Sequence, residues 1–172
     1  FETKNDVTID NYLLMIELKT AVLFAASLKV AAILSGASNN DIDSLYNFGL
    51  NIGIAFQLRD DYLDTFGKSD SFGKIIGSDI KSKKKTVLFI NAMQKSSDED
   101  RIFLEKIYSE KSILNNKDVQ LVTQIFKKYG VDEYCNQLSE SYYELASSNI
   151  KKVSVPYDKL KNYSELLFKR KN

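Results

Sequence analysis

Residues 56–64, with the sequence FQLRDDYLD, place three carboxylates within two turns of a predicted helix. Asp60 and Asp64 are four residues apart, so on a helix their Cβ atoms share one face, about 5–6 Å apart. Asp61 borders that face, and Gln57 lies one turn earlier. Carboxylates this close repel one another unless a cation lies between them, and Mg²⁺ is a hard cation that takes oxygen ligands. The segment is therefore a candidate magnesium site.

The charges around this segment oppose the helix dipole. The aspartates fall in the last turns of the predicted helix, where the dipole disfavours each exposed acid by about 0.3–1 kcal/mol. Cations are disfavoured before a helix start, which is where Lys81, Lys83, Lys84 and Lys85 lie. Charge pattern alone fits a solvated helix end beside a solvated loop, because charged surface clusters are common. Two neighbouring violations of the charge preference favour a functional site instead.

Helical periodicity extends over most of the chain. One proline, Pro156, and seven glycines are sparse punctuation, which favours long helices over a β-sandwich or barrel. We predict an all-α chain forming a single helical domain over residues 1–172. The predicted helices are 9–35, 40 or 41–64, 86–94, 98–109, 117–129, 131–152 and 156–169. Residues 65–85 lack this pattern, and a loop of that length in a compact domain is usually functional.

Local features refine the first two helices. Thr8 is suited to N-cap the first helix and Gly36 to end it. A kink is expected near Lys19, since the turns that follow are rich in alanine and can pack tightly. Gly49 and Gly53 are four residues apart, which allows another helix to approach the second helix closely.

Composition excludes several classes of protein. Lys and Arg number 24 and Asp and Glu 23, so nothing in the charge balance favours nucleic acid as a partner. No histidine is present, which removes the commonest zinc ligand and general base. The single cysteine, Cys135, excludes an internal disulfide and agrees with a cytoplasmic location. No apolar run reaches the roughly 18 residues of a spanning helix. Because the sequence begins with Phe1, we expect a piece of a longer protein.

An ordered series of motifs surrounds the aspartates. After FQLRDDYLD come Phe66-Gly67, Phe72-Gly73-Lys74, Gly77-Ser78-Asp79-Ile80 and Lys84-Lys85-Thr86. Upstream lie residues 12–16 (YLLMI), Lys19-Thr20-Ala21 and residues 32–37 (AILSGA). From about Ile9 to Ala92 this series resembles the trans-isoprenyl diphosphate synthases, also called polyprenyl synthetases, which include farnesyl and geranylgeranyl diphosphate synthases. The resemblance implies the C-terminal half of an isoprenoid-synthase-type helical bundle.

The resemblance also implies roles for individual residues. Asp60, Asp61 and Asp64 match the family's second aspartate-rich motif, which helps to hold Mg²⁺ against the diphosphate of an allylic substrate. Lys19, Lys74 and Lys84 match lysines that contact that diphosphate. Thr20 and Gln57 match polar residues of the reaction cavity. Asp79 matches an acid that supports the metal-binding residues without itself binding the metal. The implied cofactor is Mg²⁺, and the implied substrates are isopentenyl diphosphate and an allylic prenyl diphosphate.

The implied reaction is a head-to-tail condensation. Cations on the diphosphate stabilise the charge that develops as the C–O bond breaks. The double bond of isopentenyl diphosphate attacks the allylic carbocation, and a proton is then lost to the departing diphosphate. No step needs a histidine. Family members are commonly homodimers, so a homodimer is expected.

Two departures from the family qualify these expectations. The first aspartate-rich motif and the basic residues that bind isopentenyl diphosphate do not occur in this sequence, so this fragment by itself is expected to be inactive. The alternative is a non-catalytic regulatory or scaffolding subunit with the same fold. A terpene cyclase or head-to-head synthase fits less well, because the Phe-Gln-Leu-Arg-Asp-Asp and Gly-Ser-Asp-Ile contexts differ from theirs.

Overall fold

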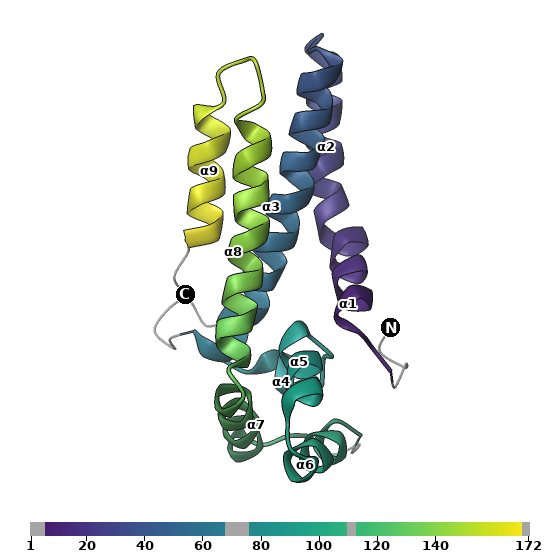
Figure 1. The fold of residues 1–172 in the computed structure, drawn as a ribbon, viewed down its shortest axis with the longest axis vertical. Helices are drawn as coiled ribbons and strands as arrows, with labels where there is room; N and C mark the ends of the chain where they lie inside the picture. The colour runs from purple at the N-terminus through teal and green to yellow at the C-terminus, as the bar shows by residue number, and fades with distance from the viewer. Residues whose placement is uncertain (1–5, 68–75, 110–112, 170–172) are drawn as a thin grey trace. The chain divides into compact units, whose positions relative to one another are not determined.

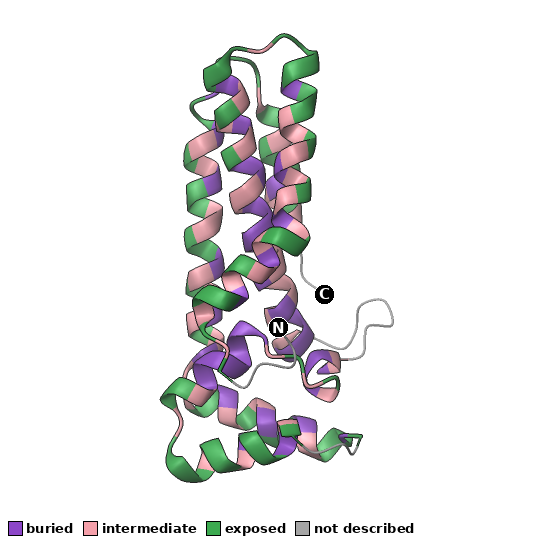
Figure 2. Cartoon of the chain, turned by 90° about the vertical axis from the view of Figure 1, so that its right-hand side faces the viewer, coloured by how far each residue is buried: buried purple, intermediate pink, exposed green. Residues whose placement is uncertain are grey.

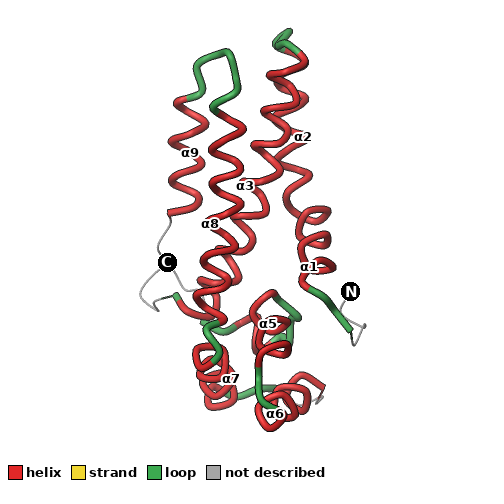
Figure 3. The backbone as a smooth tube through the Cα atoms, in the orientation of Figure 1, coloured by secondary structure: helices red, strands yellow, loops and turns green. Residues whose placement is uncertain are grey.

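The computed structural model describes residues 6–67, 76–109 and 113–169, and these residues form helices and no strand (Figures 1 and 3). The all-α prediction is confirmed. The chain divides into two compact units, which are described separately. Within the described ranges, the first unit contains residues 6–12 and 60–136, and the second contains residues 13–59 and 137–169.

The second unit is built from long helices that run side by side (Figure 1). They are α1 (Ile9–Ile16) from Leu13 onward, η1 (Glu17–Ala21), α2 (Val22–Leu34), α3 (Asn39–Phe66) as far as Arg59, α8 (Val131–Ile150) from Gln137 onward, and α9 (Asp158–Lys169). Their inward faces form a core of Ala32, Leu45, Phe48, Ile52, Ala146, Ile150 and Val153. Figure 2 shows buried stretches that alternate with exposed ones along the long helices, the pattern expected of amphipathic helices around one core.

The expected irregularity near Lys19 is a π-helical turn. The segment η1, Glu17–Ala21, interrupts the α-helix that begins at Ile9 and resumes at Val22. A π turn inserts an extra residue into the helical repeat and is a recognised cause of a kink. Thr8 caps this helix as predicted, because its hydroxyl accepts a hydrogen bond from the Asn11 amide at 3.1 Å. Gly36, with φ of +70°, follows the end of α2 in the left-handed conformation that ends many helices.

The two glycines of α3 lie where α2 and η1 approach most closely. A Cβ atom built on Gly53 would lie 2.6 Å from the Cα of Ala21, and one on Gly49 would lie 2.8 Å from the Cα of Ala25. Real Cβ atoms do not tolerate such distances, so only glycine fits at either position. The expected close approach is therefore confirmed, and alanines do provide the partner surface.

A buried carboxylate joins two loops at one end of the second unit. Asp41, which is 3% exposed, lies in the first turn of α3. It accepts hydrogen bonds from the Ser38 hydroxyl at 2.8 Å and from the Ser154 amide and hydroxyl, each at 2.7 Å. These donors lower the pKa of Asp41, the Ser154 amide most strongly. The α2–α3 turn is thereby tied to the α8–α9 loop.

The first unit is a group of shorter helices. It contains α4 (Ser78–Lys81), α5 (Val87–Lys95), α6 (Asp98–Ser109) and α7 (Asn116–Lys128), together with the start of α1, the end of α3 and the start of α8. α5 contacts α6 and α7, and α7 also contacts α4 and α6. The Asn115 side chain caps α7 by accepting hydrogen bonds from the backbone amides of Lys117 and Asp118. The Asp118 carboxylate in turn accepts a hydrogen bond from the Asn115 backbone amide.

One short helix was not predicted, and several helix bounds differ from the predicted ones by one or two residues. Residues 78–81 form the short helix α4 inside the stretch predicted to be a loop, because Asp64 hydrogen-bonds its first turn. The last helix begins at Asp158, not Pro156, with the Tyr157 carbonyl accepting its first helical hydrogen bond from Lys161. Pro156 therefore precedes the helix instead of occupying its first turn. In the described part of the chain, no helix is both long enough and apolar enough to cross a membrane.

Candidate functional site

The first unit brings several of the predicted site residues together, starting with Asp61. This aspartate is 4% exposed on the penultimate turns of α3. Its Oδ2 atom accepts a short hydrogen bond from the hydroxyl of Tyr12, which is 1% exposed on α1. Burial, followed by the neighbouring Asp61 carboxylate, raises the pKa of Tyr12 well above its ordinary value, so the phenol stays a donor.

Asp64 joins the end of α3 to the start of α4. One carboxylate oxygen accepts from the Ser78 hydroxyl at 2.5 Å, and the other accepts from the Asp79 amide at 2.9 Å. Its backbone carbonyl accepts from the Gly77 amide at 2.6 Å. Asp64 is only 3% exposed, so its carboxylate has lost most of its contact with water. These donors replace the hydrogen bonds that water would have made.

Lys84 faces these acids from the turn after α4. Its Nζ atom lies 2.5 Å from Oδ1 of Asp79, and this hydrogen bond is the main reason why the pKa of Lys84 is raised. The Asp61 and Asp64 carboxylates raise it further, so three acids lie within electrostatic range of one ammonium group. The turn depends on Lys83, whose φ of +54° is left-handed. Such a conformation costs a residue other than glycine of order 1 kcal/mol or more and is found preferentially at functional sites.

The other predicted site residues lie outside this cluster. Asp60 is half-buried on α3, next to Asp61. In the second unit, the Thr20 hydroxyl on η1 donates to Oε1 of Gln57 at 3.2 Å, so these two predicted cavity residues are in contact. Lys19 is exposed on the same π turn. Lys74 lies outside the described residues.

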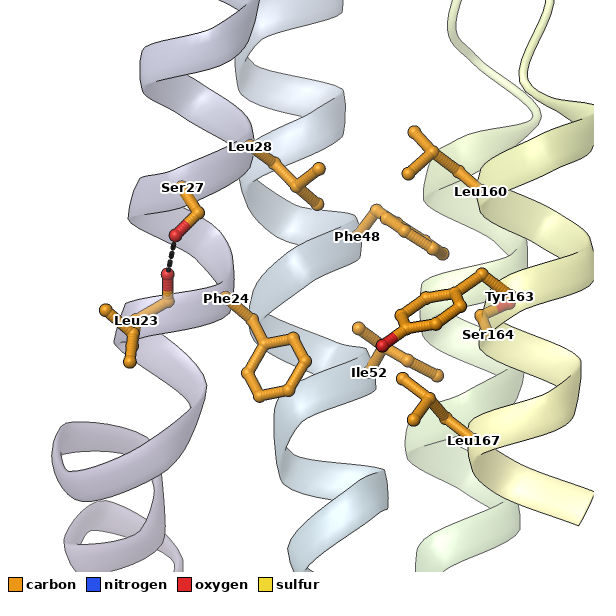
Figure 4. A pocket seen from close by; sticks show the side chains of 10 residues that line it. All are labelled: Leu23, Phe24, Ser27, Leu28, Phe48, Ile52, Leu160, Tyr163, Ser164 and Leu167. Atoms are coloured by element: carbon orange, nitrogen blue, oxygen red, sulfur yellow. Dashed lines mark hydrogen bonds between the residues drawn. The ribbon is translucent and has the colours of Figure 1, made fainter. Parts of the chain in front are cut away.

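Each unit also contains a cavity. In the second unit, a cavity of about 320 Å³ lies among α2, α3 and α9, and Figure 4 shows Phe24, Phe48 and Leu167 turned toward it. The hydroxyls of Ser27 and Ser164 in its wall donate to backbone carbonyls, each at 2.7 Å, which leaves an apolar lining. In the first unit, a cavity of about 910 Å³ lies between residues 6–8, α5 and α6.

The acids of the first unit suit a cation that also binds ligands from outside the protein. Among the residues that the structure describes, no group of three or more His, Cys, Asp or Glu side chains is placed to enclose a metal ion. Mg²⁺ in phosphate sites typically takes one or two carboxylates, substrate phosphate oxygens and water. The carboxylate oxygens of Asp60 and its buried neighbours fit a site in which protein and substrate share the ion. They fit less well a site in which the protein supplies every ligand.

Comparisons with known proteins identify the relatives of this chain. The family model described as polyprenyl synthetase matches residues 1–129. The chain is 39% identical over 153 residues to a short chain isoprenyl diphosphate synthase of Methanothermobacter thermautotrophicus, an alignment that covers 87% of the chain and 45% of the relative.

The chain belongs to the polyprenyl synthetase family.

Solved structures of the family have the same fold as this chain. A geranylgeranyl pyrophosphate synthetase from Pyrococcus horikoshii superimposes with a TM-score of 0.89 at 32% identity, covering 99% of this chain and 52% of that one. A geranylgeranyl pyrophosphate synthase from Corynebacterium glutamicum, complexed with isoprenyl diphosphate and magnesium, gives 0.87 at 28% identity, covering 96% of this chain and 48% of that one. This polyprenyl synthetase chain thus spans about half the length of the relatives it matches.

Sequence reasoning did not single out Tyr12 and Ser78, which hydrogen-bond the predicted site residues Asp61 and Asp64. Tyr12 lies 49 residues before Asp61, and its place in the apolar pattern of α1 predicts core packing. Ser78 lies 14 residues after Asp64, within the Gly77-Ser78-Asp79 motif. That motif is part of the family resemblance, which implies no role for Ser78. The motif was the available indication for Ser78, whereas nothing in the sequence pairs Tyr12 with an acid.

Proposed function

We propose that this chain supplies the diphosphate-binding half of a prenyl diphosphate synthase. The complete protein would join isopentenyl diphosphate head-to-tail to an allylic prenyl diphosphate. The observation that carries the proposal is the group of buried acids around Lys84, since Asp61, Asp64 and Asp79 all act on that ammonium. Carboxylate oxygens gathered beside an ammonium group are the kind of ligands that a magnesium–diphosphate unit takes.

The residues of the first unit would hold a magnesium ion and the diphosphate together. Bound Mg²⁺ neutralises the diphosphate and stabilises the charge that develops on it when the allylic C–O bond breaks. Asp60, next to Asp61 on α3, is more accessible than Asp61, Asp64 and Asp79 and would be the main protein ligand of the ion. Lys84, held by Asp79, would contact the diphosphate directly. A relative from Corynebacterium glutamicum was solved in complex with isoprenyl diphosphate and magnesium, which supports the choice of these two ligands.

The residues of the second unit keep the roles that the family resemblance implies for them. These are diphosphate binding for Lys19 and lining of the reaction cavity for Thr20 and Gln57, which contact each other. Lys74, Asp61 and Asp64 keep the diphosphate- and metal-binding roles that the family resemblance implies for them. The homodimeric assembly and the cytoplasmic location expected from the sequence belong to the same proposal.

Diphosphate binding by the 172-residue chain tests the proposal. We expect calorimetric titration with methylenediphosphonate, a non-hydrolysable diphosphate analogue, to show binding that requires Mg²⁺ and disappears with a chelator. Asp60→Ala should weaken this binding at least about tenfold, which corresponds to about 1.4 kcal/mol. Asp43→Ala is the matched control, because it removes an exposed aspartate from the same helix.

Two outcomes would contradict the proposal. Binding of the analogue with equal affinity in the chelator would exclude a shared metal site. Wild-type chain that does not bind at all would favour the alternative of a non-catalytic subunit with this fold.

A further inference from the structure

Tyr12 is fixed in place by the start of α1. The Thr8 hydroxyl caps the helix by accepting from the Asn11 amide at 3.1 Å, and the Tyr12 amide donates to the Thr8 carbonyl at 3.0 Å. The capped first turn sets the rotation of α1, and the Tyr12 ring is almost completely buried. Its hydroxyl donates to Oδ2 of Asp61.

The chemical nature of this donor matters because Asp61 has a competing partner. Asp61 lies within electrostatic range of Lys84, whose ammonium is already bonded to Asp79. Any rotation of the Asp61 carboxylate toward that ammonium would weaken the ability of Lys84 to meet another anion. A tyrosine hydroxyl is neutral, so it orients Asp61 without cancelling its charge. A lysine or arginine at the same place would orient the carboxylate equally well but would remove the negative charge that attracts a cation.

We propose that Tyr12 is a positioning residue of the magnesium–diphosphate site: its hydroxyl holds Asp61 in place and keeps Lys84 available for the diphosphate. The inference rests on the proposed function and assigns a role to a residue that does not itself touch the substrate. Removing a hydrogen-bond donor that orients a metal-binding side chain commonly weakens metal affinity about 10–100-fold.

The test compares two Tyr→Phe variants of the 172-residue chain. Tyr12→Phe removes only the hydroxyl and keeps the buried ring. Tyr129→Phe is the matched control, because the Tyr129 hydroxyl donates to Asp100 at 2.7 Å in the same unit, outside the acid cluster. The quantity measured by calorimetry is the Mg²⁺ concentration that gives half-maximal binding of methylenediphosphonate. We expect it to rise about tenfold in Tyr12→Phe and less than twofold in Tyr129→Phe.

A double-mutant cycle shows whether Tyr12 acts through Asp61. In a chain that already carries Asp61→Asn, adding Tyr12→Phe should change the half-saturating Mg²⁺ concentration less than twofold. If Tyr12→Phe does not fold, Asp61→Glu tests the same bond, because it keeps the charge but moves the carboxylate by one methylene. It should raise the half-saturating concentration about as much.

Each remaining outcome overturns the inference. An unchanged half-saturating concentration in Tyr12→Phe, accompanied by lower thermal stability in the chelator, would make the Tyr12 bond purely structural. A full effect of Tyr12→Phe in the Asp61→Asn background would show that Tyr12 acts elsewhere. Wild-type chain that binds the analogue without Mg²⁺ would overturn the proposed function as well, and the wild-type titration alone distinguishes that case.

Discussion

At the scale of single residues, Asp41 makes the stability of the chain depend on acid. The Ser154 amide, then the Ser154 and Ser38 hydroxyls, lower the pKa of Asp41 in the folded chain. The stabilisation is therefore complete above the pKa of an unfolded aspartate, about 3.9, and is lost as the pH falls through the lower pKa of the folded state. We expect Asp41→Asn to reduce the free energy of unfolding near neutral pH, and its deficit relative to wild type to shrink below about pH 4.

Urea unfolding over a series of pH values measures this difference. Asp43→Asn is the control, because Asp43 is exposed two residues farther along α3. Its deficit should be small and nearly independent of pH. A constant deficit for Asp41→Asn across the acid range would exclude the Asp41–Ser154 bonds as its source.

The site residues show what a sequence can reveal at this scale. The spacing of Asp60, Asp61 and Asp64 predicts a shared face, because helical geometry relates residues that are three or four apart. The Tyr12–Asp61 bond depends on where α1 packs against α3, and no local pattern encodes that contact. The left-handed Lys83, which sets the turn before Lys84, is also invisible in the sequence, since glycine is the residue expected there.

At the scale of elements, the contact of α3 with η1 tolerates no side chain. Alanine at position 53 would place its methyl group 2.6 Å from the Cα of Ala21. We expect Gly53→Ala to destabilise the chain by about 1–2 kcal/mol, because overpacking typically costs 1–3 kcal/mol and the better helix propensity of alanine offsets part of that. Thermal unfolding measures the loss.

Two further variants test the cause of that loss. Asn47→Ala, at an exposed position of α3, should change stability by less than about 0.5 kcal/mol. Adding Ala21→Gly to Gly53→Ala should recover little, because the obstructing atom nearest to the new methyl belongs to the backbone of Ala21. Full recovery would instead identify the Ala21 methyl group as the obstacle.

The helices themselves were largely predictable, and the exceptions have physical causes. The range predicted for α6 is the one observed, residues 98–109, and the other helix ends lie near their predicted positions. The short helix α4 depends on hydrogen bonds that Ser78 and Asp79 donate to Asp64, which lies 14 and 15 residues before them. Periodicity within four residues cannot reveal an element that a distant side chain stabilises.

At the scale of the whole molecule, the helical segment from Leu13 to Leu34 exposes several large apolar side chains. Leu18, Leu23 and Leu34 are 66%, 71% and 83% exposed. Large exposed apolar surface often marks a site of protein–protein contact. We expect the chain to self-associate with rising concentration, and Leu18→Gln combined with Leu34→Gln to suppress this association without lowering the melting temperature. Sedimentation equilibrium measures the assembly.

Ile102→Gln is the control for that experiment. Ile102 is 64% exposed on α6, in the other unit, so replacing it removes a comparable apolar surface from a different place. Association that persists in the double leucine variant but disappears in Ile102→Gln would assign the contact to the first unit. The family and the fold class were predictable at this scale because they depend on ordered motifs and helical periodicity, which are properties of the sequence itself.

The hydrogen bond between the Ser154 amide and Asp41 joins residues 113 positions apart. A loop of that length closes late when a chain folds, because ordering it early would cost entropy before other contacts compensate. The proton on this amide is protected from exchange with deuterated solvent while it is bonded to Asp41. Its exchange rate would therefore report how often the contact between the α2–α3 turn and the α8–α9 loop opens, although Ser154 itself is exposed.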